Sequence, residues 1–111
     1  MILTKIEKQA VVKVLMDIIN SDGRVSPSEV LYLNQLKNAL DISMSDIEEA
    51  AGMSVMRAVS TIRNMSQDEK KIVAVMLGEM VKADNNVTED EVKMYFAIIG
   101  AIEVEIPNIR I

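Results

Sequence analysis

Residues 4–20 read TKIEKQAVVKVLMDIIN, and residues 66–82 read SQDEKKIVAVMLGEMVK. Each stretch opens on a hydroxyl residue followed three positions later by Glu. This is the capping box, in which the hydroxyl and the carboxylate satisfy free backbone N–H groups at a helix start. Apolar residues then recur at helical spacing, and in the first stretch they are Ile6, Ala10, Val14 and Ile18. Both stretches are therefore predicted to be amphipathic helices.

The two stretches belong to a longer internal repeat, which aligns residues 4–42 with residues 66–104. In this register the capping box that opens at Ser26 falls on the one that opens at Thr88. Each copy is predicted to be a helical hairpin with a tight turn that carries Asp. Because one hairpin cannot bury its own apolar face, we expect the two to pack on each other about an approximate two-fold axis. The predicted fold is an all-α bundle of two pseudo-symmetric helical hairpins.

Helix-start and helix-stop residues divide the chain into six predicted helices. Five capping boxes join Thr4 to Glu7, Ser26 to Glu29, Ser45 to Glu48, Ser66 to Glu69 and Thr88 to Glu91. Pro27 suits the first turn of a helix, and Gly52 suits a helix end. The predicted helices span 5–20, 27–40, 46–51, 54–64, 67–83 and 89–102. The two short ones belong to a middle segment that we expect to cover one side of the bundle.

Two of the differences between the long helices change their apolar surface. Val75 replaces Lys13 and Gly78 replaces Met16, so the later helix is apolar around more of its circumference, as expected of a central helix. A glycine inside a helix costs about 1 kcal/mol relative to alanine. We expect the close approach of another helix to explain Gly78.

The residues after the last predicted helix alternate charged and apolar side chains up to Pro107. This run is predicted to form an extended strap, with Val104 and Ile106 packed onto the bundle. A short edge strand is the alternative. Pro107 prevents any continuation of the helix.

The composition excludes several classes of site. The chain has 111 residues, which suits one domain over residues 1–111. It contains neither Cys nor His, which removes disulfides, thiolate nucleophiles, Ser-His triads and zinc sites built from nitrogen and sulfur. The net charge of -5 argues against nucleic acid as a partner. With no secretion signal and no apolar run long enough to span a bilayer, a cytoplasmic location without membrane insertion is expected.

The turns between the paired helices carry a doubled motif. Residues 17–29 read DIINSDGRVSPSE, and residues 79–91 read EMVKADNNVTEDE. This pair resembles the doubled signature of the TerB-like family, which is associated with bacterial tellurite resistance and has a relative in the membrane-tethered DjlA co-chaperones. The second copy departs from the motif, since it lacks the proline and has Asn85 in place of Gly23. The resemblance covers nearly the whole chain and implies an all-helical binding or stress-response module, with an acidic surface associated with cations and no established catalysis.

Six acidic residues recur at matching places in the two copies and form the candidate metal site. They are Asp17, Asp22, Glu29, Glu79, Asp84 and Glu91. Carboxylate oxygens suit Ca²⁺ or Mg²⁺, and if both turns meet at one end of the bundle we expect weak binding, with a Kd of about 10⁻⁴ to 10⁻³ M. The same acids also have a structural explanation, because such residues cap helices and bond the N–H groups of turns. An EF-hand is not expected, because Ile18 and Met80 occupy its first ligand position.

Two functions from different classes are compatible with these observations. The first is a non-enzymatic interaction module that acts through an unknown protein partner in a bacterial stress or envelope-associated system. The alternative is a carboxylate- and metal-dependent hydrolase, which only the clustered acids favour. It requires a deep pocket whose floor holds at least three of the six acids. No catalytic residue is assigned, and homodimerisation is left open.

Methionine is abundant, with nine residues in the chain. Four of them crowd the middle segment, namely Met44, Met53, Met56 and Met65. Filling of gaps in the core is the usual role of this side chain. The alternative is an adaptable surface for a partner helix, which requires Met53 and Met56 to be exposed.

Overall fold

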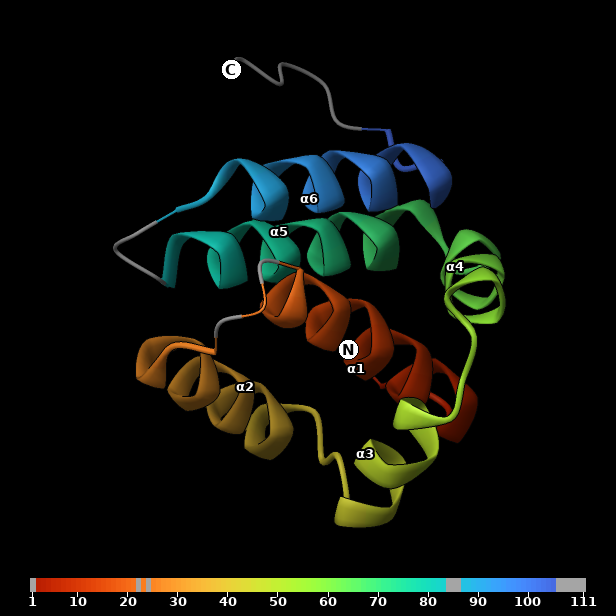
Figure 1. The fold of residues 1–111 in the computed structure, drawn as a ribbon. Helices are drawn as coiled ribbons and strands as arrows, with labels where there is room; N and C mark the ends of the chain where they lie inside the picture. The colour runs from red at the N-terminus through yellow and green to blue at the C-terminus, as the bar shows by residue number, and fades with distance from the viewer. Residues whose placement is uncertain (1, 22, 24, 84–86, 106–111) are drawn as a thin grey trace.

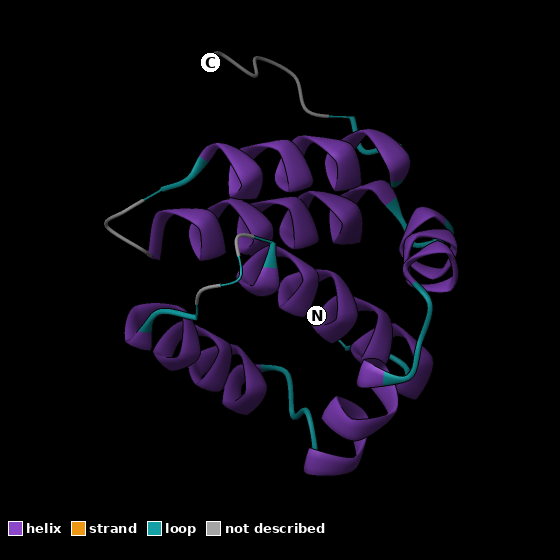
Figure 2. Cartoon of the chain, in the orientation of Figure 1, coloured by secondary structure: helices purple, strands orange, loops and turns teal. Residues whose placement is uncertain are grey.

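Six α-helices make up the described part of the chain, which in this computed structural model comprises residues 2–21, 23, 25–83 and 87–105. The helices are α1 (Lys5–Asn20), α2 (Pro27–Ala39), α3 (Met44–Ala51), α4 (Val55–Arg63), α5 (Gln67–Ala83) and α6 (Glu89–Ala101). These residues contain no strand (Figure 2). The all-α prediction is confirmed, and every predicted helix boundary lies within two residues of the observed one.

Four of the five predicted caps begin their helices as expected. At Thr4, Ser26 and Ser66, the hydroxyl accepts a hydrogen bond from the N–H three residues later, and the Glu at that position accepts one from the N–H of the cap residue. At Thr88 the hydroxyl accepts from the N–H of Glu91 at 3.2 Å. Two of these four helix starts belong to each copy of the repeat.

The capping box predicted at Ser45 is wrong, because α3 begins two residues earlier than expected. Ser43 has the extended backbone of a cap residue, and its hydroxyl accepts from the N–H of Asp46 at 3.1 Å. Asp46 in turn accepts from the N–H of Ser43 at 3.0 Å, so the shorter Asp takes the place that Glu has in the other boxes. Gly52 ends α3 as predicted.

The helices pack in a pattern that agrees with the repeat. Shifting the bounds of α1 and α2 by 62 residues gives 67–82 and 89–101, which match α5 and α6 to within one residue. The second helix of each half packs against the long helix of the other half, since α2 contacts α5 and α6 contacts α1. In the second half, α5 and α6 also lie side by side (Figure 1). The tight hairpin predicted for the first half is wrong, because α2 packs on α5 rather than on α1.

The central helix is α1, and the expectation that α5 is central is wrong. α1 packs against α3, α4, α5 and α6, whereas α5 packs against α1, α2 and α6 (Figure 1). The extra apolar face of α5 is not fully covered, because Val75 is 63% exposed. The middle segment encloses α1 instead, with α3 and α4 both packed on it.

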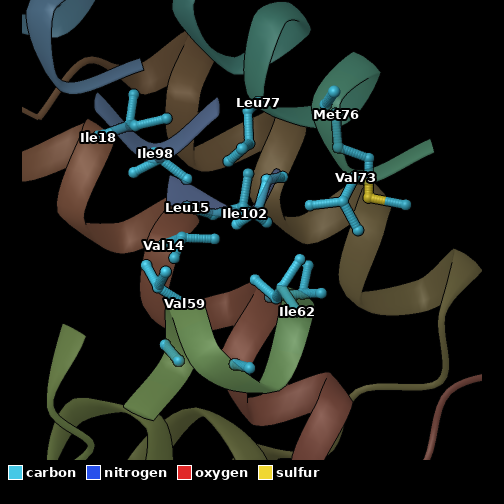
Figure 3. Close-up of a cluster of buried hydrophobic side chains, with 14 of the residues drawn as sticks. Val14, Leu15, Ile18, Val59, Ile62, Val73, Met76, Leu77, Ile98 and Ile102 are labelled. Atoms are coloured by element: carbon cyan, nitrogen blue, oxygen red, sulfur yellow. The ribbon is translucent and has the colours of Figure 1, made fainter. Parts of the chain in front are cut away.

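The hydrophobic core lies where α1, α4, α5 and α6 meet (Figure 3). Its largest fully buried apolar side chains are Leu15, Ile18, Ile62, Leu77, Met80 and Ile102. Full burial of one such side chain stabilises a fold by about 1.5 to 3 kcal/mol. A second, smaller cluster is built from Val12, Ile42 and Ala50, where α3 covers α1.

The chain that follows α6 is anchored to the start of α5. The buried amine of Lys70 donates to the backbone oxygen of Glu103 at 3.0 Å, and the N–H of Glu105 donates to Gln67 Oε1 at 3.0 Å. Val104 is half-buried and packs on the core, as predicted for the strap, while Ile106 lies outside the described residues. No helix in the described ranges has both the length and the apolar content that crossing a membrane requires.

Candidate functional site

The two buried members of the predicted acid set, Glu29 and Glu91, lie in helix caps. Each is 1% exposed. Glu29 accepts from the N–H of Ser26 at 3.0 Å and donates its own N–H to the Ser26 hydroxyl at 3.1 Å. Glu91 donates its N–H to the hydroxyl of Thr88. The complete capping box expected of Glu29 is present, and at Glu91 the hydroxyl half of the expected box is present.

The other two described acids of the set lie on the long helices beside lysines. Asp17 forms an ion pair with Lys13 at 3.0 Å, and Glu79 lies 4.0 Å from Lys82. Asp22 and Asp84 lie outside the described residues. Within the residues that are described, no group of three or more acidic side chains is placed to hold a metal ion. The six-acid cation site stays a prediction.

An apolar groove runs along α5 and α6 and has a volume of about 560 Å³. Its walls come from one face of each helix, and Glu105 lies at its edge. The lining residues are Lys71, Ala74, Val75, Gly78, Glu79, Val81, Lys82, Val92, Tyr95, Phe96 and Glu105. We call this surface the α5–α6 groove. Its volume falls in the range of sites that take small ligands or the side chains of a partner.

Two features of α5 create the α5–α6 groove. Gly78 has no side chain, and a methyl group placed there would meet only the Tyr95 ring of α6, at 3.6 Å from its hydroxyl oxygen. The helix expected to approach Gly78 closely is thus α6, but the contact comes from a side chain and leaves room for a methyl. One turn earlier Val75 is 63% exposed, and across the groove Phe96 is 38% exposed.

Charged groups lie around this apolar surface. Lys82 and Glu79 are 4.0 Å apart, and both side chains are well exposed. Lys71 is exposed and forms no ion pair within the described part of the chain. The groove therefore offers an apolar centre with a free cation beside it.

A smaller hollow of about 280 Å³ lies between α2 and the end of α5. Tyr32 and Glu79 both line it. Burial raises the pKa of the Tyr32 hydroxyl, and the negative charge of Glu79 raises it further. Glu79 lines both hollows, and it is the only one of the four described acids of the set that does so.

The groove was not predicted, although its two signals were visible in the sequence. Val75 and Gly78 are two positions where the halves differ, and an uncovered apolar face gives the same pattern as a buried one. The alternative surface for a partner helix required both Met53 and Met56 to be exposed. Met56 is 78% exposed, but Met53 is buried, so the requirement is met at one of the two positions.

The comparisons with known proteins bear on the fold. No protein-family model matches the chain, and neither does any curated protein. The chain is similar to the crystal structure of a protein of unknown function from Porphyromonas gingivalis W83, with a TM-score of 0.81 and 20% sequence identity. The match covers 96% of this chain and 91% of that one. At this level of identity the similarity establishes the fold alone.

Proposed function

We propose that the protein is a cytoplasmic, non-enzymatic interaction module of the TerB-like kind, which binds a protein partner through the α5–α6 groove. Its setting would be a bacterial stress or envelope-associated system, with tellurite resistance as one example. The doubled turn motif at residues 17–29 and 79–91 supports the family assignment.

The observation that carries the proposal is the exposure of Val75 and Phe96 on the two walls of one groove. Single exposed apolar residues are ordinary, but apolar residues gathered in a hollow with a charged rim are typical of a recognition surface. A comparison of the two halves also supports a recognition surface. Val75 occupies the position of a lysine in the other half, and Gly78 the position of a bulky methionine. Both differences remove side chains that would cover or fill the surface.

The alternative hydrolase draws no support from the hollows. It requires at least three of the predicted acids on the floor of one pocket, and of the four acids of that set that the structure describes, only Glu79 lines the α5–α6 groove. The chain also has no Cys or His to act as nucleophile or neutral-pH base. The described residues therefore favour the interaction module over the hydrolase.

Site-specific photocrosslinking in the native host tests the proposal. A photoreactive amino acid is placed at position 75 in the groove or at position 56 on α4, which is also exposed and serves as the matched control. We expect a defined protein adduct from position 75 that is absent from position 56 and is weakened by Gly78→Glu, which places a carboxylate in the apolar groove. The same adducts from both positions would contradict the proposal, as would an adduct that Gly78→Glu leaves unchanged.

A further inference from the structure

The end of each half is built in the same way. After α2 the chain turns at Asp41, which has a positive φ of 54°, and after α6 it turns at Glu103, with a φ of 56°. These two residues are 62 positions apart, the offset of the repeat, and both adopt a backbone conformation that is uncommon outside glycine. The two halves therefore correspond residue by residue as far as the turn that follows the second helix.

In the first half, α3 covers the face of α1 that Val12 and Met16 belong to. Ile42 and Ala50 form a buried cluster with Val12, and Met16 and Ile47 pack against that cluster. At its edge the Gln9 side chain, which is buried, donates a hydrogen bond to Glu49 of α3. Ile47 and Ala50 of this eight-residue helix, together with Ile42 just before it, thus cover this face.

The corresponding face of α5 is the α5–α6 groove. Four residues of α5 that line the groove have counterparts on α1 at the offset of 62. Lys71 corresponds to Gln9, Ala74 to Val12, Val75 to Lys13 and Gly78 to Met16. Exposure differs at two of the four pairs, since Lys71 and Val75 are exposed whereas Gln9 is buried and Lys13 partly buried. Ala74 is buried like Val12, and Gly78 is partly buried like Met16. The described residues therefore present, on α5, the counterpart of a surface that takes a helix on α1.

We infer that the partner segment is a short amphipathic helix of the α3 type, seated on α5 as α3 is seated on α1. This inference rests on the proposed function and names the chemistry of the partner. The helix carries apolar side chains at positions i and i+3, as Ile47 and Ala50 do in α3, and these enter the groove beside Val75 and Gly78.

Charge complementarity sets the direction of this helix. In the first half the acidic Glu49 meets the neutral Gln9, and the counterpart of Gln9 in the groove is the cation Lys71. An acidic residue two positions after the first apolar anchor, as Glu49 follows Ile47, would lie near Lys71 and form an ion pair with it. The partner helix is expected to be acidic on this edge.

An NMR titration of the full-length ¹⁵N-labelled chain tests the inference with a synthetic peptide of residues 42–52. Because an isolated helix of this length is marginal in water, the peptide carries Met44→Lys and a lactam bridge from this lysine to Glu48, both positions being exposed in α3. We expect saturable shifts confined to residues that line the groove, Val75, Gly78 and Tyr95 among them. Ile47→Glu in the peptide should abolish the shifts, whereas Ala51→Glu, at an exposed position, should leave them.

Variants of the protein provide the matched controls. Val75→Glu places a carboxylate in the apolar centre and should weaken binding at least about tenfold. Lys71→Glu reverses the charge at the edge and should weaken binding of the peptide but not of its Glu49→Gln form. Leu31→Glu, at an exposed site on α2 outside the groove, should have no effect.

Several outcomes would overturn the inference. Shifts on α1 and α3 would show that the peptide only displaces α3, and concentration-dependent groove shifts without peptide would identify a second copy as the occupant. Binding only after deletion of residues 106–111 would assign the groove to the chain's own C-terminal segment. A groove that gives protein adducts from position 75 but does not bind the bridged peptide would leave the proposed function standing and refute the helical partner.

Discussion

The carboxylate of Asp46 shows how strongly one side chain is tied to a helix start. It is buried and accepts a hydrogen bond from the N–H of Ser43 at 3.0 Å. That backbone hydrogen bond lowers the pKa of Asp46, with help from the Ser43 hydroxyl, and outweighs burial, which raises it. A carboxyl with a lowered pKa in the folded state stabilises the fold above its unfolded pKa, and this contribution is lost as the pH falls through the folded value.

The first prediction concerns acid stability. We expect Asp46→Asn to lower the free energy of unfolding by about 1 kcal/mol at neutral pH, because it weakens the cap. Since the effect needs the ionised carboxylate, the difference from wild type should shrink as the pH falls below about 4. Urea denaturation followed by circular dichroism between neutral and acidic pH measures it. Glu48→Gln, an exposed position on the same helix, is the control, and a difference for Asp46→Asn that does not change with pH would contradict the account.

The second prediction compares the caps of the two halves. Ser26→Ala and Thr88→Ala each remove a hydroxyl that accepts from the N–H of a buried Glu, so each should destabilise the protein by about 1 kcal/mol. Ser28→Ala, two residues into α2 and exposed, should have little effect. Chemical denaturation of the three variants measures the changes. Free energies of unfolding for the two cap variants that equal that of Ser28→Ala would contradict this contribution of the caps.

Most helix bounds could be predicted because caps and periodicity are local properties of a sequence. The exception at α3 is also local, since Ser43 and Ser45 both precede an acidic residue by three positions and α3 uses the earlier one. Which helix covers which face is a property of packing and could not be predicted in the same way. Val75 and Gly78 indicated an apolar face on α5, but a sequence pattern does not distinguish a covered face from an open one.

The third prediction concerns the glycine of α5. Gly78→Ala should raise the free energy of unfolding by up to about 1 kcal/mol, because alanine favours the helix and its methyl meets Tyr95 at an ordinary contact distance. Gly100→Ala in α6, where a methyl meets nothing within 4 Å, is the matched control and should also stabilise. Gly23→Ala should destabilise, because Gly23 has a φ of 76°. A loss of stability in Gly78→Ala would mean that α5 and α6 pack more closely there.

Over the whole molecule, the two halves share one design and differ in what covers their long helices. The helices of each half and the packing of one half on the other could be predicted from the 62-residue register, since caps and core positions recur together. The hairpin predicted for the first half could not, because α2 packs on α5 rather than on α1. The six predicted site acids, by contrast, are explained by local contacts where the structure describes them. Glu29 and Glu91 lie in the caps that the sequence pattern predicted for them, and Asp17 is paired with Lys13, so three of the six acids have local partners.

The central claim is that α5 exposes a groove where the equivalent face of α1 is covered, and thiol reactivity measures this directly because the chain has no cysteine of its own. Single variants Lys13→Cys and Val75→Cys place a thiol at equivalent positions, with Leu31→Cys as an exposed reference. Maleimide labelling rates of the folded proteins are compared. The account predicts that the Val75→Cys variant reacts nearly as fast as the reference and much faster than Lys13→Cys, whose native side chain is only 20% exposed. Equal rates at positions 13 and 75 would contradict it.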